Sequence, residues 1–503
     1  MKRWLLACVS MLCMVALLVG CGNDTAKQGK HLNVGLYWFG ETLDPTHEWD
    51  AWTLTRIGAG ETLATVTPDM KFTGQLADSW ENIDPTTWKF HIRENVKFHN
   101  GTAMTPQKVK ESIEYTMKQS PRSAKAVKIE SITVDGQNLI IKTTEPNGSL
   151  LSSLTEPAFV IMDTADLKDV ASKPVLTGPY KITSFTKGES IELTAFADYW
   201  GGKPGLDSVT VKDIEDNNKR AMALQSKDVD VIQKVDSANR SLFKEGFNMQ
   251  DVSGVRVMML KVNHTEASPL HDKNVRSAVA HIINYDTMAK VIGGGALAGG
   301  APFPPSANLG YDGLSNKEVT DLAKANELLT QAGYVKNGNG IYAKDGKELK
   351  LTLAIWGKDT SMYEEIQQEL KEAGIAVELR KLQSPNEVDT LGVDAFDLVE
   401  RNVVTMSTND PYWFLSLFYK SGSKANVGGY NNPQVDALID KLAVTFDQER
   451  TNVAKQVQSI LLDDVADIYL LYPAANVVST SKVKNVPVHP IDYYLLTKDS
   501  TIE

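Results

Sequence analysis

Apolar residues recur along the chain with the spacings of both strands and helices. Every second residue is apolar from Leu32 to Leu36 and again from Trp88 to Ile92, which is typical of strands that bury one face. The run from Ile468 to Tyr472 is apolar throughout and predicts a fully buried strand. The body of the protein is therefore expected to contain both α-helices and β-strands.

Three helices are predicted from apolar residues three or four positions apart and from the residues that cap them. Thr105 and Pro106 form an N-terminal cap followed by a first-turn proline. Ser361 and Glu364 have the spacing of a capping box, and Gly374 is suited to end that helix. A third helix is expected to begin at Asn432-Pro433. The inward positions are Val109, Ile113 and Met117 in the first helix, Ile366, Leu370 and Ala373 in the second, and Val435, Leu438, Ile439 and Leu442 in the third.

The first residues have the pattern of an export signal. Lys2 and Arg3 precede an apolar run over residues 4–20, which is short for a transmembrane helix. The sequence Leu18-Val19-Gly20-Cys21 resembles the bacterial lipobox, which implies cleavage before Cys21 and attachment of a lipid to its thiol. We expect a signal peptide over residues 1–20 and a lipid-anchored tether over residues 21–30. The protein would then sit on the outer face of the cytoplasmic membrane, and an uncleaved anchor is the alternative.

Composition excludes several classes of protein. The chain has 503 residues, of which 42% are hydrophobic and 23% are charged, as in an ordinary globular protein. Its 52 basic and 63 acidic residues give a net charge of −11, so it lacks the basic excess of a nucleic-acid-binding protein. Cysteine occurs only at positions 8, 13 and 21, so the processed body has no disulfide or thiol nucleophile.

Sequence signatures of catalysis are missing. The chain has no GxxxxGK[ST], GxGxxG, GxSxG or HExxH motif. We therefore predict that the protein is not an enzyme and uses no catalytic cofactor. A catalytic triad brought together only by folding is the alternative.

A series of short motifs runs in a fixed order through most of the chain. Any one of them is a weak signal, and the ordered set is a strong one. The segments are Leu76–Glu81, Trp88–Gly101, Thr177–Tyr180, Asp198–Pro204, Arg220–Asp230, Val275–Ala278 and Ala325–Tyr334.

This set resembles the family 5 extracellular solute-binding proteins, the oligopeptide, dipeptide and nickel receptors of ABC importers. The resemblance implies an α/β, two-lobe, class II periplasmic-binding-protein-like fold in which two crossover strands join the lobes. The first lobe would comprise residues 31–262 and 476–503, with an extra subdomain at about 68–175, and the second lobe residues 263–475. Such a monomeric receptor closes on its ligand and is recognised by a permease that works with an ATPase.

Two ligand classes remain open within this family. Many peptide receptors carry an aspartate three residues before the Asp-Pro of the second lobe, where it binds the peptide ammonium group. In this chain the pair is Asp410-Pro411 and the corresponding residue is Ser407, which disfavours a peptide. Glu400 or Asp397 could take over that role, so an oligopeptide or dipeptide is retained as the alternative ligand.

The aromatic segment from Tyr37 to Trp52 looks most like the nickel-type branch. We predict that His47 and His489 bind a divalent ion, because imidazole is a good ligand for Ni²⁺. Two imidazoles leave coordination positions for a small chelator such as histidine. The alternative is that both histidines lie in solvated loops. His264 and His271 are weaker candidates, and His31, His91, His99 and His281 are assigned to solvent or local capping.

The remaining predicted ligand-binding residues are aromatic or basic. Trp38 and Trp49 are expected to wall the cleft, whereas Trp52 is assigned to the core. Arg56 and Arg401 would pair with chelator carboxylates, unless they form ordinary salt bridges. The predicted ligand-binding set is Tyr37, Trp38, Trp49, Arg56, Arg401 and Trp413.

Overall fold

The computed structural model describes residues 29–309, 319–357, 359–390 and 392–503. The predicted signal peptide, the lipobox with Cys21 and most of the predicted tether lie outside these residues. Within the described ranges, no helix is both long enough and apolar enough to cross a membrane.

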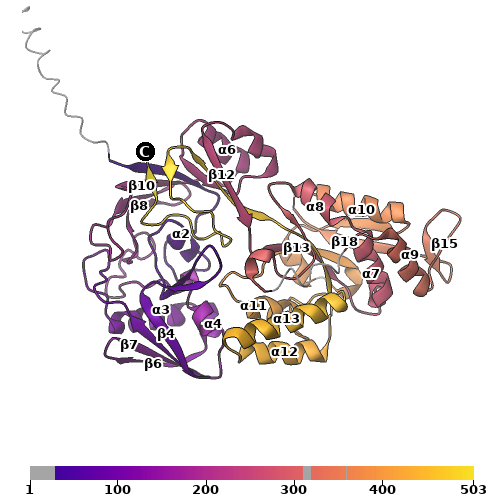
Figure 1. The fold of residues 1–503 in the computed structure, drawn as a ribbon, viewed down its shortest axis with the longest axis horizontal. Helices are drawn as coiled ribbons and strands as arrows, with labels where there is room; N and C mark the ends of the chain where they lie inside the picture. Colours follow the sequence, from indigo (N-terminus) through magenta and orange to yellow (C-terminus); the bar gives the residue numbers. More distant parts are fainter. Residues whose placement is uncertain (1–28, 310–318, 358, 391) are drawn as a thin grey trace, which may run out of the picture.

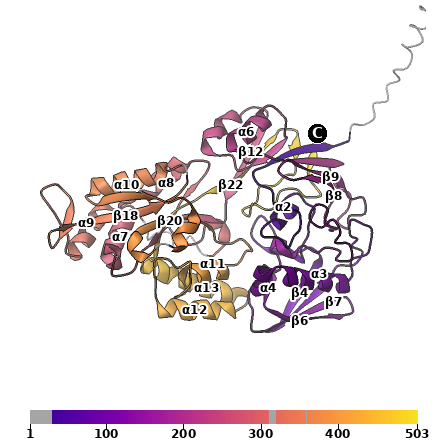
Figure 2. The ribbon, with the colours of Figure 1, turned by 180° about the vertical axis from the view of Figure 1, so that it is seen from behind.

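The molecule consists of two lobes, each built around a mixed β-sheet (Figures 1 and 2). In the first lobe β1 lies inside a seven-stranded sheet, parallel to both β10 and β11. The alternation from Leu32 to Leu36 is confirmed, since these positions are buried in the core of this lobe. The strands, in sheet order, are β12 Phe247–Ser253, β22 Ala474–Thr480, β11 Val231–Gln233, β1 His31–Leu36, β10 Ser208–Asp213, β9 Ser190–Ala195 and β8 Tyr180–Thr186.

The second lobe has a six-stranded sheet with helices on both faces. The predicted strand at Ile468–Tyr472 is confirmed as β21, which is buried along its whole length. One face of the sheet packs against the helices within residues 273–373 and the other against the helices within residues 412–463. The strands, in sheet order, are β14 Leu297–Ala298, β21 Asp467–Tyr472, β13 Arg256–Val262, β20 Leu398–Val404, β18 Lys350–Ile355 and β19 Ala376–Lys381.

The chain passes between the two sheets at two places. The first passage is Gly254-Val255, between β12 and β13, and the second is Pro473, between β21 and β22. Because β13 pairs with β20 over its whole length and with β21 from Met258 to Lys261, it belongs to the second lobe. The lobe boundaries expected at residues 262 and 475 therefore move to about 255 and 473.

A smaller sheet in the first lobe has its own hydrophobic core. Its strands lie within the range 68–175 expected for an extra subdomain, and Trp88, Phe90 and Ile92 of β5 point into the core. Helices α3 and α4 lie beside this sheet (Figure 1). The elements are β4 Ala77–Asp84, β5 Thr87–Ile92, β7 Asn138–Thr143, β6 Ile129–Asp135, α3 Pro106–Gln119, α4 Pro121–Val127 and α5 Leu150–Ser153.

The three predicted helices are present, with one shift at a cap. Thr105 caps α3 by accepting a hydrogen bond from the Lys108 N–H, and Asn432 caps α12 in the same way. In α10 the N-cap is Thr360 rather than Ser361, and its hydroxyl donates to Glu364 at 2.6 Å. The remaining helices are α2 Ala51–Arg56 and α6 Asn217–Gln225 in the first lobe, and α7 Lys273–Ile282, α8 Tyr285–Ile292, α9 Leu322–Gln331, α10 Ser361–Ala373, α11 Tyr412–Tyr419, α12 Pro433–Ala443 and α13 Asp447–Asp463 in the second.

Minor sheets complete the fold. Two of them have two strands each and one has three. They consist of β2 Ala64–Val66 with β3 Phe72–Gly74, β23 Val483–Lys484 with β24 Thr501–Ile502, and β15 Val335–Lys336, β16 Tyr342–Lys344 and β17 Lys347–Glu348.

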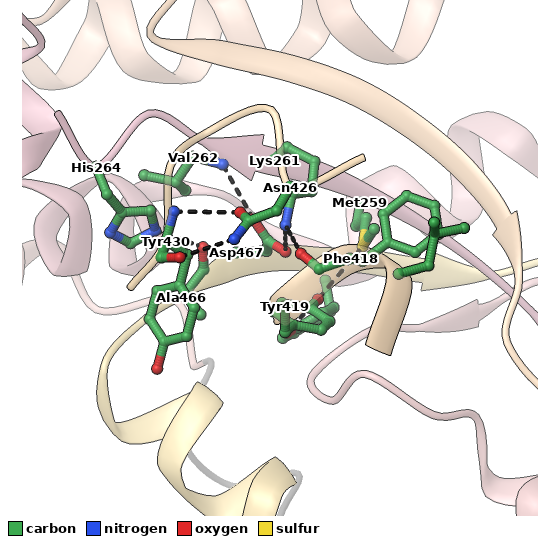
Figure 3. A network of polar contacts seen from close by, with 12 residues as sticks. Met259, Lys261, Val262, His264, Phe418, Tyr419, Asn426, Tyr430, Ala466 and Asp467 are labelled. Atoms are coloured by element: carbon green, nitrogen blue, oxygen red, sulfur yellow. Dashed lines mark hydrogen bonds and ion pairs between the residues drawn. The ribbon is translucent and has the colours of Figure 1, made fainter. Parts of the chain in front are cut away.

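A charged pair lies inside the second lobe (Figure 3). Lys261 of β13 donates to the Asp467 carboxylate of β21 at 2.8 Å, and both side chains are almost fully buried. Lys261 also donates to the Phe418 carbonyl, and the other Asp467 oxygen accepts from the Val262 N–H at 3.1 Å. This network ties the end of α11 to two central strands.

Candidate functional site

A cavity of about 460 Å³ lies between the lobes, beside the two chain passages. Gly254, Val255 and Pro473 of those passages form part of its lining. Its volume falls within the range of small-molecule binding sites. Both lobes supply polar side chains: Lys234, Asp236 and Asp492 from the first, and Arg256, Asp359 and Asn402 from the second.

A charged cluster supports the first-lobe side of the cavity. The Asp492 carboxylate accepts from the Tyr37 hydroxyl at 2.9 Å and from Lys234 at 2.6 Å. Arg56 is fully buried and donates from Nη2 to the Tyr37 hydroxyl and from Nε to the Asp492 carbonyl, both at 2.9 Å. Burial by itself would raise the pKa of Asp492, but Lys234 and Arg56 hold this pKa well below its usual range. Arg56 therefore positions Tyr37 and Asp492 in this arrangement.

A row of aromatic rings leads from the α2 region to the cavity. The centroid distances are 5.0 Å from Trp49 to Trp52, 5.3 Å from Trp52 to Tyr493 and 5.0 Å from Tyr493 to Tyr494. Trp52, which was assigned to the core, is half-buried and packs against the hydrophobic core, and it also lines the cavity. Aromatic rows of this kind offer flat apolar surface to a ligand.

The outer end of this row carries a basic side chain that the sequence reasoning missed. Arg122 of α4 lies over the ring of Trp49, 3.9 Å from its centroid, and donates to the Glu48 carbonyl at 2.9 Å. Arg122 also forms an ion pair with Glu156, which accepts from the Trp52 indole N–H at 3.2 Å. The side chains of α2, α4 and the loop at Glu156 thus form one polar and aromatic surface.

His489 lines the cavity but is buried, whereas an exposed loop was expected. Its Nδ1 accepts from the Ile491 N–H at 2.9 Å, so the ring proton is on Nε2, which donates to the Val66 carbonyl at 3.1 Å. Burial lowers the pKa of His489, so the ring remains neutral at neutral pH. Both nitrogens are thus engaged by the backbone in this arrangement.

His47 has a different environment. Its side chain is 46% exposed, and Nδ1–H donates to the Asp50 carboxylate at 2.8 Å. This hydrogen bond leaves the lone pair on Nε2, the arrangement in which a carboxylate orients a metal-binding imidazole. The bond to Asp50 also raises the pKa of His47 above its ordinary value. The rings of Trp49, Trp52 and Tyr493 lie between this part of the chain and the His489 loop.

The other predicted ligand-binding residues are more scattered. Trp38 is half-buried, and Trp413 of α11 is 48% exposed with its ring edge near Phe418. Arg401 of β20 is buried, with its guanidinium carbon 5.8 Å from the ring centroid of Trp356. Of the predicted metal and ligand-binding residues, His489 is the one found among the described residues that line the cavity. The others do not line it: Tyr37, Trp38, His47, Trp49, Arg56, Arg401 and Trp413.

The two acids considered as peptide anchors lie inside the second lobe. The Glu400 carboxylate accepts from the Trp356 N–H at 2.7 Å. The Asp397 carboxylate accepts from Ser268 at 2.6 Å and from the Thr352 N–H at 2.7 Å. The acids that reach the cavity are instead Asp236, Asp359 and Asp492.

Two further histidines differ from their expected positions. His99, which was assigned to solvent or local capping, is buried, and its ring is paired with the Gly178 carbonyl at 2.9 Å and lies against Phe196. His264, a weaker metal candidate, is paired with the Ala466 carbonyl at 2.8 Å and packs against Tyr430. No group of three or more His, Cys, Asp or Glu side chains that could hold a metal ion occurs among the described residues.

Arg256 is the polar residue of the cavity that the sequence most clearly could have indicated. It is the first residue of β13, directly after the passage between the lobes, and its Nη1 donates to the Asn402 carbonyl at 3.1 Å. Because the lobe boundary was expected at residue 262, Arg256 fell within the expected first lobe and was not singled out as a cavity residue.

Comparisons with known proteins agree with this architecture. The model of the bacterial extracellular solute-binding proteins, family 5 (middle), matches residues 71–426. The nickel-binding protein NikA of Staphylococcus aureus is 33% identical over 497 residues, covering 97% of each chain. Its crystal structure in complex with Ni(L-His)2 has a TM-score of 0.74 at 31% identity, covering 94% of this chain and 100% of that one. The probable D,D-dipeptide-binding periplasmic protein DdpA of Escherichia coli is 27% identical over 480 residues, covering 90% of each chain.

Proposed function

Because this chain belongs to family 5 of the bacterial extracellular solute-binding proteins, we propose that it captures nickel, or another divalent metal, as a complex with a small chelator. Proteins of this family are transport receptors of ABC importers and not enzymes. On this proposal the protein is held by a lipid on Cys21, and it delivers the chelate to the permease and ATPase subunits of its importer.

The cavity between the lobes is the observation that carries the proposal. Its lining contains the cationic side chains of Arg256 and Lys234 together with the rings of Trp52 and Tyr493. A chelator such as histidine supplies carboxylates for the cations and a flat ring for the aromatic wall. The nickel-binding protein NikA of Staphylococcus aureus supports this ligand class, since its crystal structure contains Ni(L-His)2.

We further propose that His47 and His489 complete the coordination of the ion. His47 offers its Nε2 lone pair once Asp50 has fixed the ring. The lone pair of His489 is on Nδ1, which must first release the Ile491 N–H, so its participation requires a local rearrangement of the loop at Pro490. Closure of the lobes around the chelate would drive that rearrangement.

Calorimetric titration with Ni²⁺ plus L-histidine tests the proposal. We expect Arg256→Gln and His47→Ala each to weaken binding about tenfold or more, since each removes a charged or coordinating contact. Matched controls are Arg380→Gln and His31→Ala, because these side chains lie on β19 and at the start of β1, outside the residues that line the cavity. Wild-type affinity in both Arg256→Gln and His47→Ala would refute the nickel–histidine proposal.

A short peptide is the second candidate. It is favoured by the D,D-dipeptide relative and by the carboxylates of Asp236 and Asp359 in the cavity, which suit a ligand ammonium group. A heat of binding with dipeptides, lost in Asp236→Asn and Asp359→Asn, together with no heat for nickel plus histidine, would support this function instead.

A further inference from the structure

The two lobes also touch far from the chain passages. In Figure 1, α4 of the first lobe faces α12 and α13 of the second, at the opposite end of the molecule from β12. The second view shows the same proximity (Figure 2). A rotation about the passages at residues 254–255 and 473 moves this seam more than any point near the passages.

An ion pair of the second lobe forms one side of the seam. Arg450 of α13 binds the Asp410 carboxylate with two hydrogen bonds, from Nε at 2.7 Å and from Nη2 at 2.8 Å. Both residues are buried, with 9% and 7% of their surfaces exposed. Bidentate pairs of this geometry are among the stronger charged contacts in proteins.

The first lobe covers this pair with two small residues, Gly148 and Ser149. The Ser149 hydroxyl accepts from Arg450 Nη2 and donates to Asp410 at 3.3 Å. The Gly148 N–H donates to the Ala443 carbonyl at 2.9 Å. A Cβ added at Gly148 would lie 2.1 Å from the Thr445 carbonyl oxygen and 2.5 Å from Arg450 Nη1, so only glycine fits here.

Which lobe each of these groups belongs to decides which contacts are lost when the lobes separate. Asp410 and Arg450 both belong to the second lobe, so their ion pair survives separation and gains access to water. Of the contacts made to this pair, the hydrogen bonds of Gly148 and Ser149 are lost, and water can replace them. The contact therefore leaves no charge unpaired in either state, and its strength is that of a few hydrogen bonds.

We propose that Gly148 and Ser149, docked on the Asp410–Arg450 pair, form a reversible latch that favours the closed arrangement of the lobes before any ligand binds. Neighbouring contacts reinforce it: Asn409 donates to the Met70 carbonyl at 2.9 Å, and the rings of Trp88 and Phe446 lie 5.9 Å apart. A larger closed population before binding raises the apparent affinity, because less of the binding free energy is then used to close the lobes.

Distance measurements between spin labels, made without ligand, test the latch. The chain has cysteine only at positions 8, 13 and 21, so replacing these by serine allows unique labelling. Ala126→Cys on α4 and Ala437→Cys on α12 place labels on exposed positions of the two lobes. We expect a short-distance population in the otherwise unmodified chain.

Two variants weaken the latch to different degrees. Ser149→Ala removes both hydrogen bonds of the hydroxyl group, so it should lower the ratio of short to long distances by at least about three- to tenfold. Gly148→Ala should lower it more than tenfold, because the added methyl group cannot fit while the lobes touch. Gly148 does not have a left-handed backbone, so alanine is compatible with its own lobe. Gly338→Ala is the matched control, since its Cβ would meet nothing within 4 Å.

The measurement involves neither nickel nor peptide, so its result does not depend on the proposed cargo. Unchanged distances in Ser149→Ala and Gly148→Ala would overturn the latch. So would an unliganded parent chain that shows only long distances. If Gly148→Ala does not fold, as judged by its thermal unfolding, Ser149→Ala alone decides between these outcomes.

Discussion

The second lobe contains two buried ion pairs with nearly equal N–O distances but different enclosure. Lys261 and Asp467 lie 2.8 Å apart and are covered entirely by their own lobe. Arg450 and Asp410 lie 2.7 Å apart, and residues of the other lobe complete their cover. The difference shows that burial within a lobe serves the fold, whereas burial between lobes can serve the equilibrium between open and closed states.

The surroundings of the interior pair, Lys261 and Asp467, explain why movement of the lobes does not expose this pair to water. Desolvation lowers the pKa of Lys261 and raises the pKa of Asp467, while their mutual attraction opposes both shifts. The ring of Tyr419 lies 4.4 Å from the Lys261 nitrogen, and its hydroxyl is 2.8 Å from that of Tyr469. Water can reach this pair only if the second lobe unfolds.

The largest expected loss of stability follows from removing one member of the interior pair, Lys261 and Asp467. Lys261→Met leaves the Asp467 charge buried without its partner, which should lower the free energy of unfolding by about 3–5 kcal/mol. Unfolding in urea, followed by tryptophan fluorescence, measures the loss.

The double variant Lys261→Met/Asp467→Asn is the control for this prediction. Asparagine keeps an oxygen for the Val262 N–H but removes the unpaired charge. It should therefore be more stable than Lys261→Met alone. If it is less stable, the buried charge is not the origin of the loss.

Removing one member of the pair at the seam, Asp410 and Arg450, should lower the stability less. Arg450→Met leaves Asp410 with hydrogen bonds from Ser149 and from the Tyr412 N–H, and opening of the lobes admits water. We expect a loss of about 1–2 kcal/mol in the free energy of unfolding, measured in the same way. A loss as large as that of Lys261→Met would break the comparison, since it would mean that the seam is as permanent as the lobe interior.

Individual strands and helices could be predicted from the sequence because they depend on neighbouring residues. The strand at β1 and the helices α3 and α12 were predicted because spacing and capping are read from neighbouring residues. The edge of the first lobe was misplaced because the apolar residues of β13 indicate a strand but not its sheet. That choice depends on pairing with β20, more than a hundred residues away.

The site was harder to predict for the same reason. Sequence reasoning selected Tyr37, Arg56 and His489, which the structure brings close to one another through Asp492 and its loop. It missed Arg256 and Arg122, whose positions depend on chain passages and helix packing. His99 was assigned to solvent or local capping because it lies in the turn after a predicted strand, yet Gly178 and Phe196, far along the chain, enclose it.

The smallest expected effect concerns pH and contrasts a lobe interior with the surface near the cavity. Burial lowers the pKa of His99 to about 4, against about 6.5 in the unfolded chain. Between these values the unfolded chain binds a proton that the folded chain does not. Stability is therefore lost as pH falls below about 6.5, and by pH 5.5 His99 should account for about 1 kcal/mol.

Urea unfolding at pH 7 and pH 5.5 checks this contribution. His99→Gln retains a donor for the Gly178 carbonyl but cannot be protonated, so the variant should lose less stability between the two pH values than the wild type. Part of the loss should remain, because burial also lowers the pKa values of His264 and His489. His47→Gln is the control with the opposite sign: the folded chain raises the pKa of His47, so this histidine stabilises the fold below about pH 6.5 and loses that effect as pH rises. An equal loss in wild type and His99→Gln would show that water reaches His99, and that the interior of the first lobe opens as readily as the seam.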